Sequence, residues 1–227
     1  MEYKLIRSKR KSFGLEINKD GELLVRAPVN LKQSEIDRLL RDKKDWIEKK
    51  QKEILQHVSD KKEVSFSEGD RFLVWGHWYP LEVVINPKRH KIEIELKEKC
   101  IKIRMPMVNP EEVRKALEMW YRHMSNDFIC KCVEHYDQCF SKSINNITIK
   151  EQKKRWGSCS SKGNLNFNWR LSMAPKAVCE YVVIHEMCHL VHMDHSKAYW
   201  KVVEQLDPNY KKHRKWLKEN GHHMYWD

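Results

Sequence analysis

An apolar run near the end of the chain, VVIHEMCHLVHMDH at residues 182–195, carries four histidines, a glutamate and an aspartate. Burying a polar group without a partner costs roughly 2–7 kcal/mol, so the fold must bring these side chains together. The run contains the pattern H-E-x-x-H. With 12 histidines and no more than 32 glutamates in 227 residues, about 0.09 chance matches to this pattern are expected. Chance is a poor explanation, and a shared chemical task is the better one.

The spacing of the pattern indicates a metal site on a helix. His185 and His189 are four residues apart, so they share one helix face, where two imidazole nitrogens can reach one ion at about 2.1 Å each. Glu186 projects to one side of them, where it is badly placed to be a ligand but can reach a water beside the ion. We therefore expect Glu186 to be the general base of a metal-dependent hydrolase.

The third metal ligand has three candidates. His192 follows His185 by seven residues and would lie about 10.5 Å further along a continuous helix, whereas two ligands of one ion are at most roughly 4 Å apart. His195 lies beyond residues 193 and 194, where the chain can reverse and return, with Asp194 or Ser196 capping the next helix. Glu204 is a remoter alternative. His195 is the preferred third ligand.

The first 108 residues are rich in strand patterns. A β-hairpin is predicted around the turn Asp20-Gly21, where two alternating apolar pairs face each other, Leu15 and Ile17 against Leu23 and Val25. Ser34 and Asp37 predict the start of one long helix, with apolar positions at Ile36, Leu40, Ile47, Ile54 and Val58. Alternation returns between residues 71 and 105 and predicts a second antiparallel set of strands.

The second half of the chain has helical and strand patterns in turn. Asn109 and Pro110 predict the start of a long helix, and short strands are expected around residues 147–149 and 165–169. A helix that is apolar on nearly every side follows from Pro175, which indicates a core helix. The prediction is an α+β fold, with a β-rich region with one amphipathic helix over residues 1–108 and a hydrolase domain over residues 109–227, whose active-site helix lies beside an antiparallel sheet.

Composition limits the compartment and the partners. No apolar run resembles a secretory signal or approaches the roughly 18 residues needed to span a membrane, so a cytoplasmic location and no membrane partner are expected. The seven cysteines form no paired C-x-x-C zinc knuckles, so reduced thiols are the better interpretation. The formal net charge of +12 favours a polyanionic partner or substrate without identifying it.

Two stretches carry a resemblance to a known family. RWGSCSSKGNLNFNWRL, followed by YVVIHEMCHLVHMDHSKAYW, resembles the YgjP-like metallopeptidase family, which is related to the SprT and WLM zinc peptidases. The resemblance is specific over residues 153–200 and extends over most of the chain. It implies a zincin-like catalytic half, with His185, His189 and His195 as zinc ligands and Glu186 as catalytic base. Asp194 and Tyr199 depart from the pattern, where Asn and Phe are usual, outside the metal shell.

The substrate-binding residues are harder to predict than the metal site. By resemblance to peptidases of this class, the strand Leu165–Trp169 is expected to pair with an extended peptide, with the Asn166 and Asn168 side chains on its free face. A strand that simply covers the core is an equal alternative. Arg155 and Lys154 precede this strand and are candidates for stabilising an oxyanion or binding phosphate; ordinary surface charge is equally favoured.

Three functions remain open on sequence. The first is a zinc-dependent metallopeptidase acting on a peptide or protein. The second is a metal-dependent nucleoside triphosphate pyrophosphatase or phosphohydrolase, favoured by the positive charge but lacking a Gly-rich phosphate loop. The third is a nucleic-acid-associated protease or binding module, for which the basic and aromatic stretch at residues 210–226 is the candidate, although its helical spacing suits an amphipathic helix packed on the catalytic half.

Overall fold

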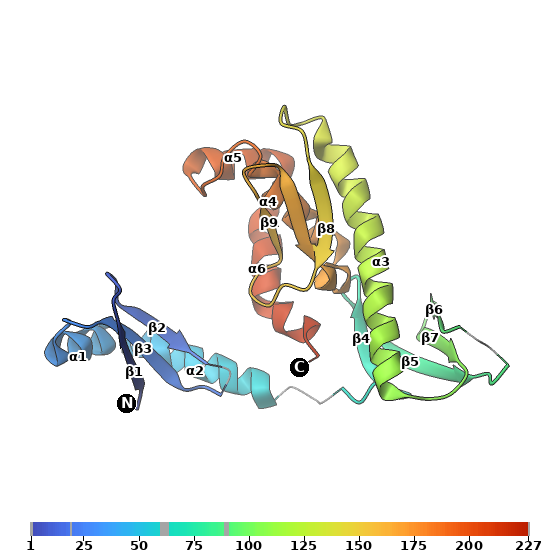
Figure 1. The fold of residues 1–227 in the computed structure, drawn as a ribbon, viewed down its shortest axis with the longest axis horizontal. Coiled ribbons are helices and arrows are strands. Elements are labelled where there is room, and N and C mark those ends of the chain that lie inside the picture. Colours follow the sequence, from blue (N-terminus) through green and yellow to red (C-terminus); the bar gives the residue numbers. More distant parts are fainter. Residues whose placement is uncertain (1, 19, 60–63, 89–90, 227) are drawn as a thin grey trace. The chain divides into compact units, whose positions relative to one another are not determined.

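The computed structural model describes residues 2–18, 20–59, 64–88 and 91–226, without the side chains of residues 53–59. Contacts divide the chain into two compact units, residues 1–63 and 64–227. This division differs from the predicted boundary between residues 108 and 109, because the strands of residues 71–105 pack into the same hydrophobic core as the C-terminal helices. Helices and strands are mixed in both units, which confirms the α+β class (Figure 1).

Unit 1 is a small sheet packed on two helices. Its elements are β1 (Lys4–Ser8), β2 (Gly14–Ile17), β3 (Leu23–Pro28), α1 (Gln33–Asp42) and α2 (Lys44–Ser59). The sheet order is β1-β3-β2, and alternate residues of β3 are buried against the helices. The core comprises Leu23, Val25, Ala27, Ile36, Leu40 and Ile47. The side chains of Ile54 and Val58 lie outside the described part of the structure.

The predicted hairpin of unit 1 is confirmed, including its register. Leu15 pairs with Val25 and Ile17 with Leu23 in the antiparallel pair β2–β3. β1 adds to the other edge of β3 in parallel, which was not predicted. The expected single helix is two helices, because the backbone of Lys43 (φ −110°, ψ 11°) leaves the helical region between them. The first helix begins at Gln33 rather than after a Ser34 cap.

Unit 2 contains two sheets and four α-helices in its described residues. Its first sheet has the order β4-β5-β7-β6. The other elements are β8–β10 and the helices that pack beside them. In chain order the elements are β4 (Arg71–Val74), β5 (His77–Ile85), β6 (Glu93–Leu96), β7 (Ile101–Met105), α3 (Pro110–Asp137), β8 (Asn146–Lys150), β9 (Gly157–Cys159), β10 (Asn164–Asn168), the 3-10 turn η1 (Trp169–Met173), α4 (Lys176–Cys188), α5 (Lys197–Leu206), α6 (Tyr210–Asn220) and the 3-10 turn η2 (Gly221–Met224).

Both sheets of unit 2 are mixed rather than antiparallel. The pairs β4–β5 and β6–β7 are antiparallel as expected, but β5 and β7 are parallel. In the second sheet, of order β8-β10-β9, the central β10 is parallel to β8 and antiparallel to β9. The prediction of an antiparallel sheet beside the active-site helix is therefore correct for the pair β9–β10 and wrong for the pair β8–β10, which is parallel. Side-chain alternation predicts a strand but not the direction of its partner.

Two local features fix the ends of the helices that carry the core. The Asn109 side chain accepts hydrogen bonds from the backbone N–H groups of Glu111 and Glu112, and Pro110 is the first residue of α3, as predicted. The β4–β5 turn contacts the start of α4, because a Cβ at Gly76 would lie 2.7 Å from Pro175 Cγ. Gly76 also has φ +85°, so only glycine suits this turn. The turn thereby packs against the first residues of α4 and fixes the position of its N-terminus.

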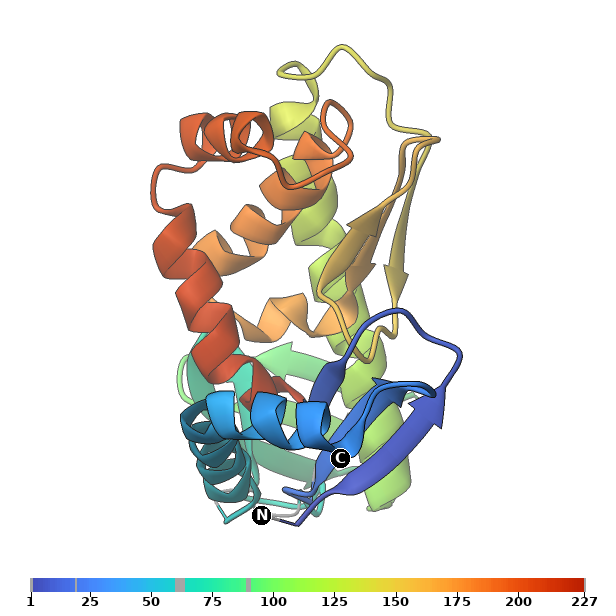
Figure 2. The same cartoon turned by 90° about the vertical axis from the view of Figure 1, so that its left-hand side faces the viewer.

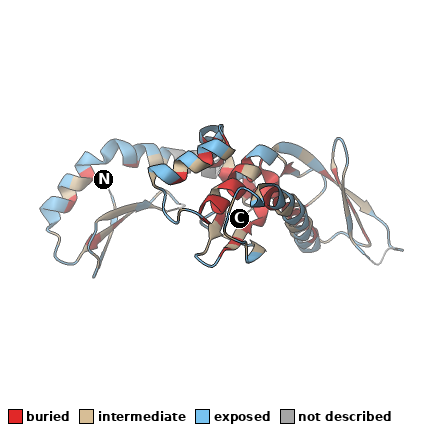
Figure 3. Ribbon diagram, turned by 90° about the horizontal axis from the view of Figure 1, so that it is seen from above, coloured by how far each residue is buried: buried red, intermediate tan, exposed pale blue. Residues whose placement is uncertain are grey.

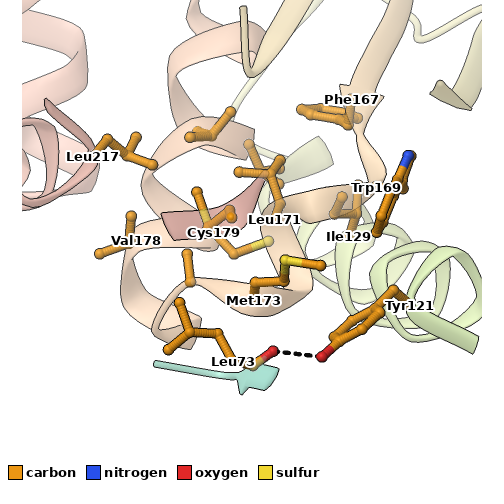
Figure 4. Close-up of a cluster of buried hydrophobic side chains, with 14 of the residues drawn as sticks. Leu73, Tyr121, Ile129, Phe167, Trp169, Leu171, Met173, Val178, Cys179 and Leu217 are labelled. Atoms are coloured by element: carbon orange, nitrogen blue, oxygen red, sulfur yellow. Dashed lines mark hydrogen bonds between the residues drawn. The ribbon is translucent and has the colours of Figure 1, made fainter. Parts of the chain in front are cut away.

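The core of unit 2 surrounds η1 and α4. Figure 4 shows Leu171, Met173, Val178 and Cys179 packed among side chains from α3, β10 and α6. In Figure 3 many of the buried residues of unit 2 gather around this core, while unit 1 has buried residues of its own. None of the helices in the described ranges combines the length and apolar character needed to cross a bilayer. The helix that carries the H-E-x-x-H pattern is thus held by the interior of unit 2.

A buried hydrogen bond joins the first sheet to α3. The Tyr121 hydroxyl donates to the Leu73 carbonyl oxygen at 2.7 Å, and Tyr121 is fully buried (Figure 4). Replacing Tyr121 with Phe leaves that carbonyl without its partner and is expected to lower the free energy of unfolding by about 1–3 kcal/mol, measured by urea denaturation. Replacing the exposed Met119 of the same helix with Ala is the control, with an expected change below about 0.5 kcal/mol. Equal stability of the Tyr121 variant and the parent would contradict this assignment.

Candidate metal centre

The helix α4 is a core helix, as its sequence predicts. Nine of its residues are buried, and it packs against α3, α5, α6 and β9. Figure 2 shows it between α6 and the β8-β10-β9 sheet. The helix ends at Cys188, and His189 is its C-terminal cap. The chain then turns before α5, so residues 190–196 are free to return toward the helix.

The return of the chain brings three histidines together. One ring nitrogen from each of His185, His189 and His195 lies within 4.8 Å of the other two. Nε2 of His185 and Nε2 of His195 are 3.3 Å apart, which matches the roughly 3.4 Å between two nitrogen ligands of a tetrahedral zinc ion. No other group of three histidines, cysteines or carboxylates within the described ranges has metal-site spacing.

His192 contributes to this cluster through its backbone rather than its ring. Its carbonyl oxygen lies 2.9 Å from Nδ1 of His189. A carbonyl can only accept, so Nδ1 carries the proton and Nε2 of His189 keeps a free lone pair for an ion. Glu204, the remoter candidate, instead forms an exposed ion pair with Lys211 at 3.6 Å.

The aromatic rings of α5 form the floor of the histidine cluster. Tyr199 is fully buried and stacks on His189 with 4.7 Å between ring centroids. Its hydroxyl donates to the His185 carbonyl oxygen at 2.9 Å. Trp200 stacks on His195, and the Ser196 hydroxyl caps α5 by accepting from the Tyr199 N–H. The departure from the family pattern at Tyr199 therefore adds a hydrogen bond to the backbone of a proposed ligand.

The electrostatic environment favours the neutral form of His185 and His195. Burial lowers the pKa of His185 to about 3, with further lowering from the neighbouring His189, His195 and Arg214. Burial also lowers the pKa of His195, and the neighbouring His189 and Arg214 lower it further. A neutral imidazole is the form that binds a metal ion, so the lowered pKa values of His185 and His195 suit these two rings to a divalent cation.

Glu186 is buried beside the cluster and closely surrounded. Burial raises the pKa of its carboxyl to about 8, while the Arg155 charge and a hydrogen bond from the Cys159 backbone N–H act to lower it. A Cβ at Gly157 would lie 2.6 Å from Glu186 Cγ and Oε1. Strand β9 therefore approaches the carboxylate as closely as only glycine allows.

Replacing Gly157 with Ala is expected to lower kcat by about 10–100-fold, because the new methyl group displaces the Glu186 carboxylate. Zinc binding should stay unchanged, since the three atoms nearest the new methyl group belong to Glu186 and not to a proposed ligand. Turnover and zinc content of the purified variant are measured together. Ser158→Ala is the control in the same strand. Full activity of the Gly157 variant would show that the carboxylate position is not critical.

A pocket of about 370 Å³ opens at Glu186 and His185. Its walls come from the loop before β9, from α4 and from α6. Besides these two residues it is lined by Arg155, Trp156, Gly157, Tyr181, Val182, Arg214, Leu217 and Lys218. The pocket is therefore lined by apolar and cationic side chains, with Glu186 as its one acidic lining residue in the described structure.

The predicted substrate-binding residues do not all lie at this pocket. Arg155 lines it. Asn168 is fully buried, donates to the Gln152 carbonyl oxygen at 2.7 Å and accepts from the Arg170 N–H, so its role is to hold the chain around β10. Asn166 donates to Ser158 Oγ across the sheet and does not line the pocket. Strand β10 is the central strand, so both of its edges are already occupied.

Sequence reasoning missed three residues of the site: Gly157, Tyr199 as a support for the cluster, and Arg214. The glycine in the quoted RWGSC stretch was the available signal for a close backbone approach. Tyr199 stands one helical turn after the His195 segment, within reach of the ligands. Arg214 had no signal, because only the packing of α6 against α4 brings it to the pocket.

This arrangement defines a candidate metal-dependent hydrolase, with an imidazole cluster beside a buried carboxylate and an open pocket. The chain belongs to the YgjP-like metallopeptidase domain family, whose model matches residues 11–220. Membership implies a metal cofactor and peptide or protein substrates, and the sequence-based recognition of the family is confirmed. It gives no support to a nucleic-acid partner.

One solved structure that is similar to this chain is the metallopeptidase zymogen of Pyrococcus abyssi abylysin. The identity is 22%, and the match covers 40% of this chain and 93% of that chain with a TM-score of 0.36. A likeness this weak adds nothing to the assignment of the fold. Among curated proteins, none matches the sequence.

Proposed function

We propose that this protein is a zinc-dependent peptidase in which His185, His189 and His195 hold the ion and Glu186 acts as general base. The observation that carries the proposal is the convergence of three ring nitrogens, within 4.8 Å of one another, on the helix face beside a buried carboxylate. These groups come from α4 and from the turn after it, so their approach depends on the fold as well as on the motif. The zincin-like architecture implied by the family belongs to the same proposal.

The donor set fits zinc. Three imidazole ligands leave a fourth tetrahedral position open, as in catalytic rather than structural zinc sites. When bound, zinc lowers the pKa of a coordinated water and polarises the substrate carbonyl group. The carbonyl oxygen of His192 supports the site from outside, because it fixes the ring orientation and tautomer of His189.

Glu186 supplies the proton transfers. Its burial and raised pKa make the carboxylate a stronger base than an exposed glutamate. It accepts a proton from the attacking water and returns that proton to the leaving amine nitrogen. Arg155, whose charge acts on the Glu186 carboxyl, is placed to stabilise negative charge that develops on the substrate.

The peptide is expected to pair with β9 rather than with the predicted β10. β9 is at the edge of the β8-β10-β9 sheet, and Gly157 of this strand touches the Glu186 side chain. An extended peptide that adds to an exposed strand edge gains main-chain hydrogen bonds without needing a particular side chain. This position would carry a peptide bond past the carboxylate.

The proposal is tested by incubating the zinc-loaded full chain with a mixed-sequence peptide library and identifying new termini by mass spectrometry. We expect cleavage that is absent from Glu186→Gln and from chelator-treated protein. Nucleoside triphosphate hydrolysis is the second candidate function, which the cationic pocket lining favours. Phosphate or pyrophosphate release, detected by phosphorus NMR and lost in Glu186→Gln, without any peptide cleavage, would replace the peptidase proposal.

The remaining predictions concern partners and location. In the basic C-terminal stretch, Tyr210 and Leu217 are buried and α6 packs on α4, as an amphipathic helix does. Lys211 and Lys215 form ion pairs with Glu204 and Glu219. The sequence allowed two interpretations of this stretch, a nucleic-acid-binding surface or an amphipathic helix packed on the catalytic half. These contacts are those of the packed helix. A cytoplasmic location stays a prediction.

A further inference from the structure

The pocket beside Glu186 carries an unbalanced positive charge. Arg155 comes from the loop before β9, while Arg214 and Lys218 come from consecutive turns of α6. None of the three forms an ion pair with a carboxylate in the described part of the chain. Arg155 acts electrostatically on Glu186, the one acidic lining residue, so three cations face one carboxylate in this pocket. The excess of positive charge is suited to an anionic group of the substrate.

The two faces of α6 differ in this respect. Lys211 and Lys215 point away from the pocket, and each lies near a carboxylate, Glu204 at 3.6 Å and Glu219 at 3.8 Å. Arg214 and Lys218 line the pocket and have no such partner among the described residues. The lysines on the face away from the pocket have acidic neighbours, whereas the cations that line the pocket do not form such ion pairs. A general excess of basic residues does not explain this difference between the two faces.

Arg214 is held in place by its aromatic neighbour. Its guanidinium carbon lies 5.1 Å from the centroid of the Trp200 ring, which is a cation–π distance. Trp200 in turn stacks on the proposed ligand His195, with 5.7 Å between centroids and 28° between planes. A guanidinium supported in this way loses less conformational entropy on binding than a free side chain, and its planar donors suit a carboxylate.

We infer that the pocket formed by Arg155, Arg214 and Lys218 selects peptides with an acidic side chain next to the bond to be cleaved. The inference rests on the proposed peptidase function and adds its substrate class. Tyr181, Val182 and Leu217 provide apolar contacts for the methylene groups of a glutamate side chain, and the cations contact its carboxylate. Arg214 is thus a specificity-determining residue.

The test measures binding separately from cleavage. Zinc-loaded full chain carrying Glu186→Gln is titrated by calorimetry with acetyl-Ala-Ala-Glu-Ala-Ala-amide and with the matching peptide that has Gln in place of Glu. We expect the Glu peptide to bind about tenfold more tightly at low ionic strength, with the ratio falling toward about threefold in about 0.5 M NaCl. Equal affinity of the two peptides would overturn the inference.

Two variants of α6 assign the preference to the pocket. Adding Arg214→Gln is expected to reduce the preference for Glu to less than about threefold, whereas Lys215→Gln, which removes the same charge from the other face, should leave it intact. Equal effects of both variants would indicate a nonspecific charge effect and contradict the inference. Inorganic tripolyphosphate is titrated in parallel, and tight binding of it without any preference for the Glu peptide would assign the cations to a phosphate chain instead.

Cleavage of the same two peptides by the parent protein keeps this inference apart from the proposed function. A Glu preference in binding without cleavage of any library peptide would support the pocket and refute the peptidase proposal. Cleavage of library peptides with no preference for an acidic residue would support the peptidase and refute the pocket.

Discussion

Replacing Glu186 with Gln is expected to lower kcat by about 10²–10⁴-fold while the protein keeps its zinc. Gln has nearly the same shape, so it fits against Gly157, but its amide cannot accept the proton of the attacking water. The measurement compares turnover of the best library peptide with zinc content by mass spectrometry. A loss of turnover at constant zinc content separates a general base from a metal ligand.

The control for this variant is Glu204→Gln. Glu204 is the remoter ligand candidate and lies in an exposed ion pair with Lys211, so its replacement should change neither turnover nor zinc content. Loss of zinc from Glu204→Gln would make it a ligand and contradict the histidine cluster. Activity of Glu186→Gln equal to that of the parent would refute the assigned base.

Replacing His195 with Ala is expected to weaken zinc binding by at least about 100-fold, and His192→Ala by less than about threefold. Loss of residues that only orient ligands already costs roughly 10–100-fold in metal affinity, and loss of a ligand costs more. The His192 ring is not part of the cluster, and the carbonyl that contacts His189 belongs to the backbone, which Ala retains. Competition with a chromophoric chelator gives both dissociation constants.

The two histidine variants make a matched pair, because each removes one imidazole from the same turn after α4. Similar zinc affinity in both variants would contradict the choice of third ligand. Weakening by His192→Ala alone would require the turn to rearrange so that the His192 ring replaces that of His195.

The convergence of His185, His189 and His195 was predictable because it depends largely on local geometry. The four-residue spacing of His185 and His189 fixes their shared face on any helix. The argument that a continuous helix would carry His192 too far away also favours His195. The helix ends at Cys188, before His192, so the conformation of the turn decides between them: the His192 carbonyl oxygen faces His189, and the His195 ring joins the cluster. The cap of α3 at Asn109 and the register of the β2–β3 hairpin follow from equally local rules.

The edge strand proposed to bind the substrate was not predictable from side-chain patterns. β10 alternates Leu165 and Phe167 with asparagines and is the clearer strand in the sequence, yet it is central. β9 has only three residues, Gly-Ser-Cys, with little strand propensity, and its place beside Glu186 depends on the close contact at Gly157. Pairing partners arise from contacts distant in sequence, which alternation alone does not encode.

The domain boundary failed as a prediction for a related reason. The change from strand patterns to a long helix near Pro110 looked like a boundary. Instead β7 and α3 contribute to one core, in which Ile101 and Met105 lie in the same buried cluster as Leu117 and Tyr121. Secondary-structure composition changes there, but the hydrophobic core does not.

Anomalous diffraction at the zinc edge from crystals of the zinc-loaded protein is the measurement that tests the central claim most directly. The account predicts one strong peak among His185, His189 and His195, at about 2.1 Å from one ring nitrogen of each, with the Glu186 carboxylate outside the ligand shell. A zinc peak elsewhere, or one coordinated by Glu186 or by the His192 ring in place of His195, would contradict it.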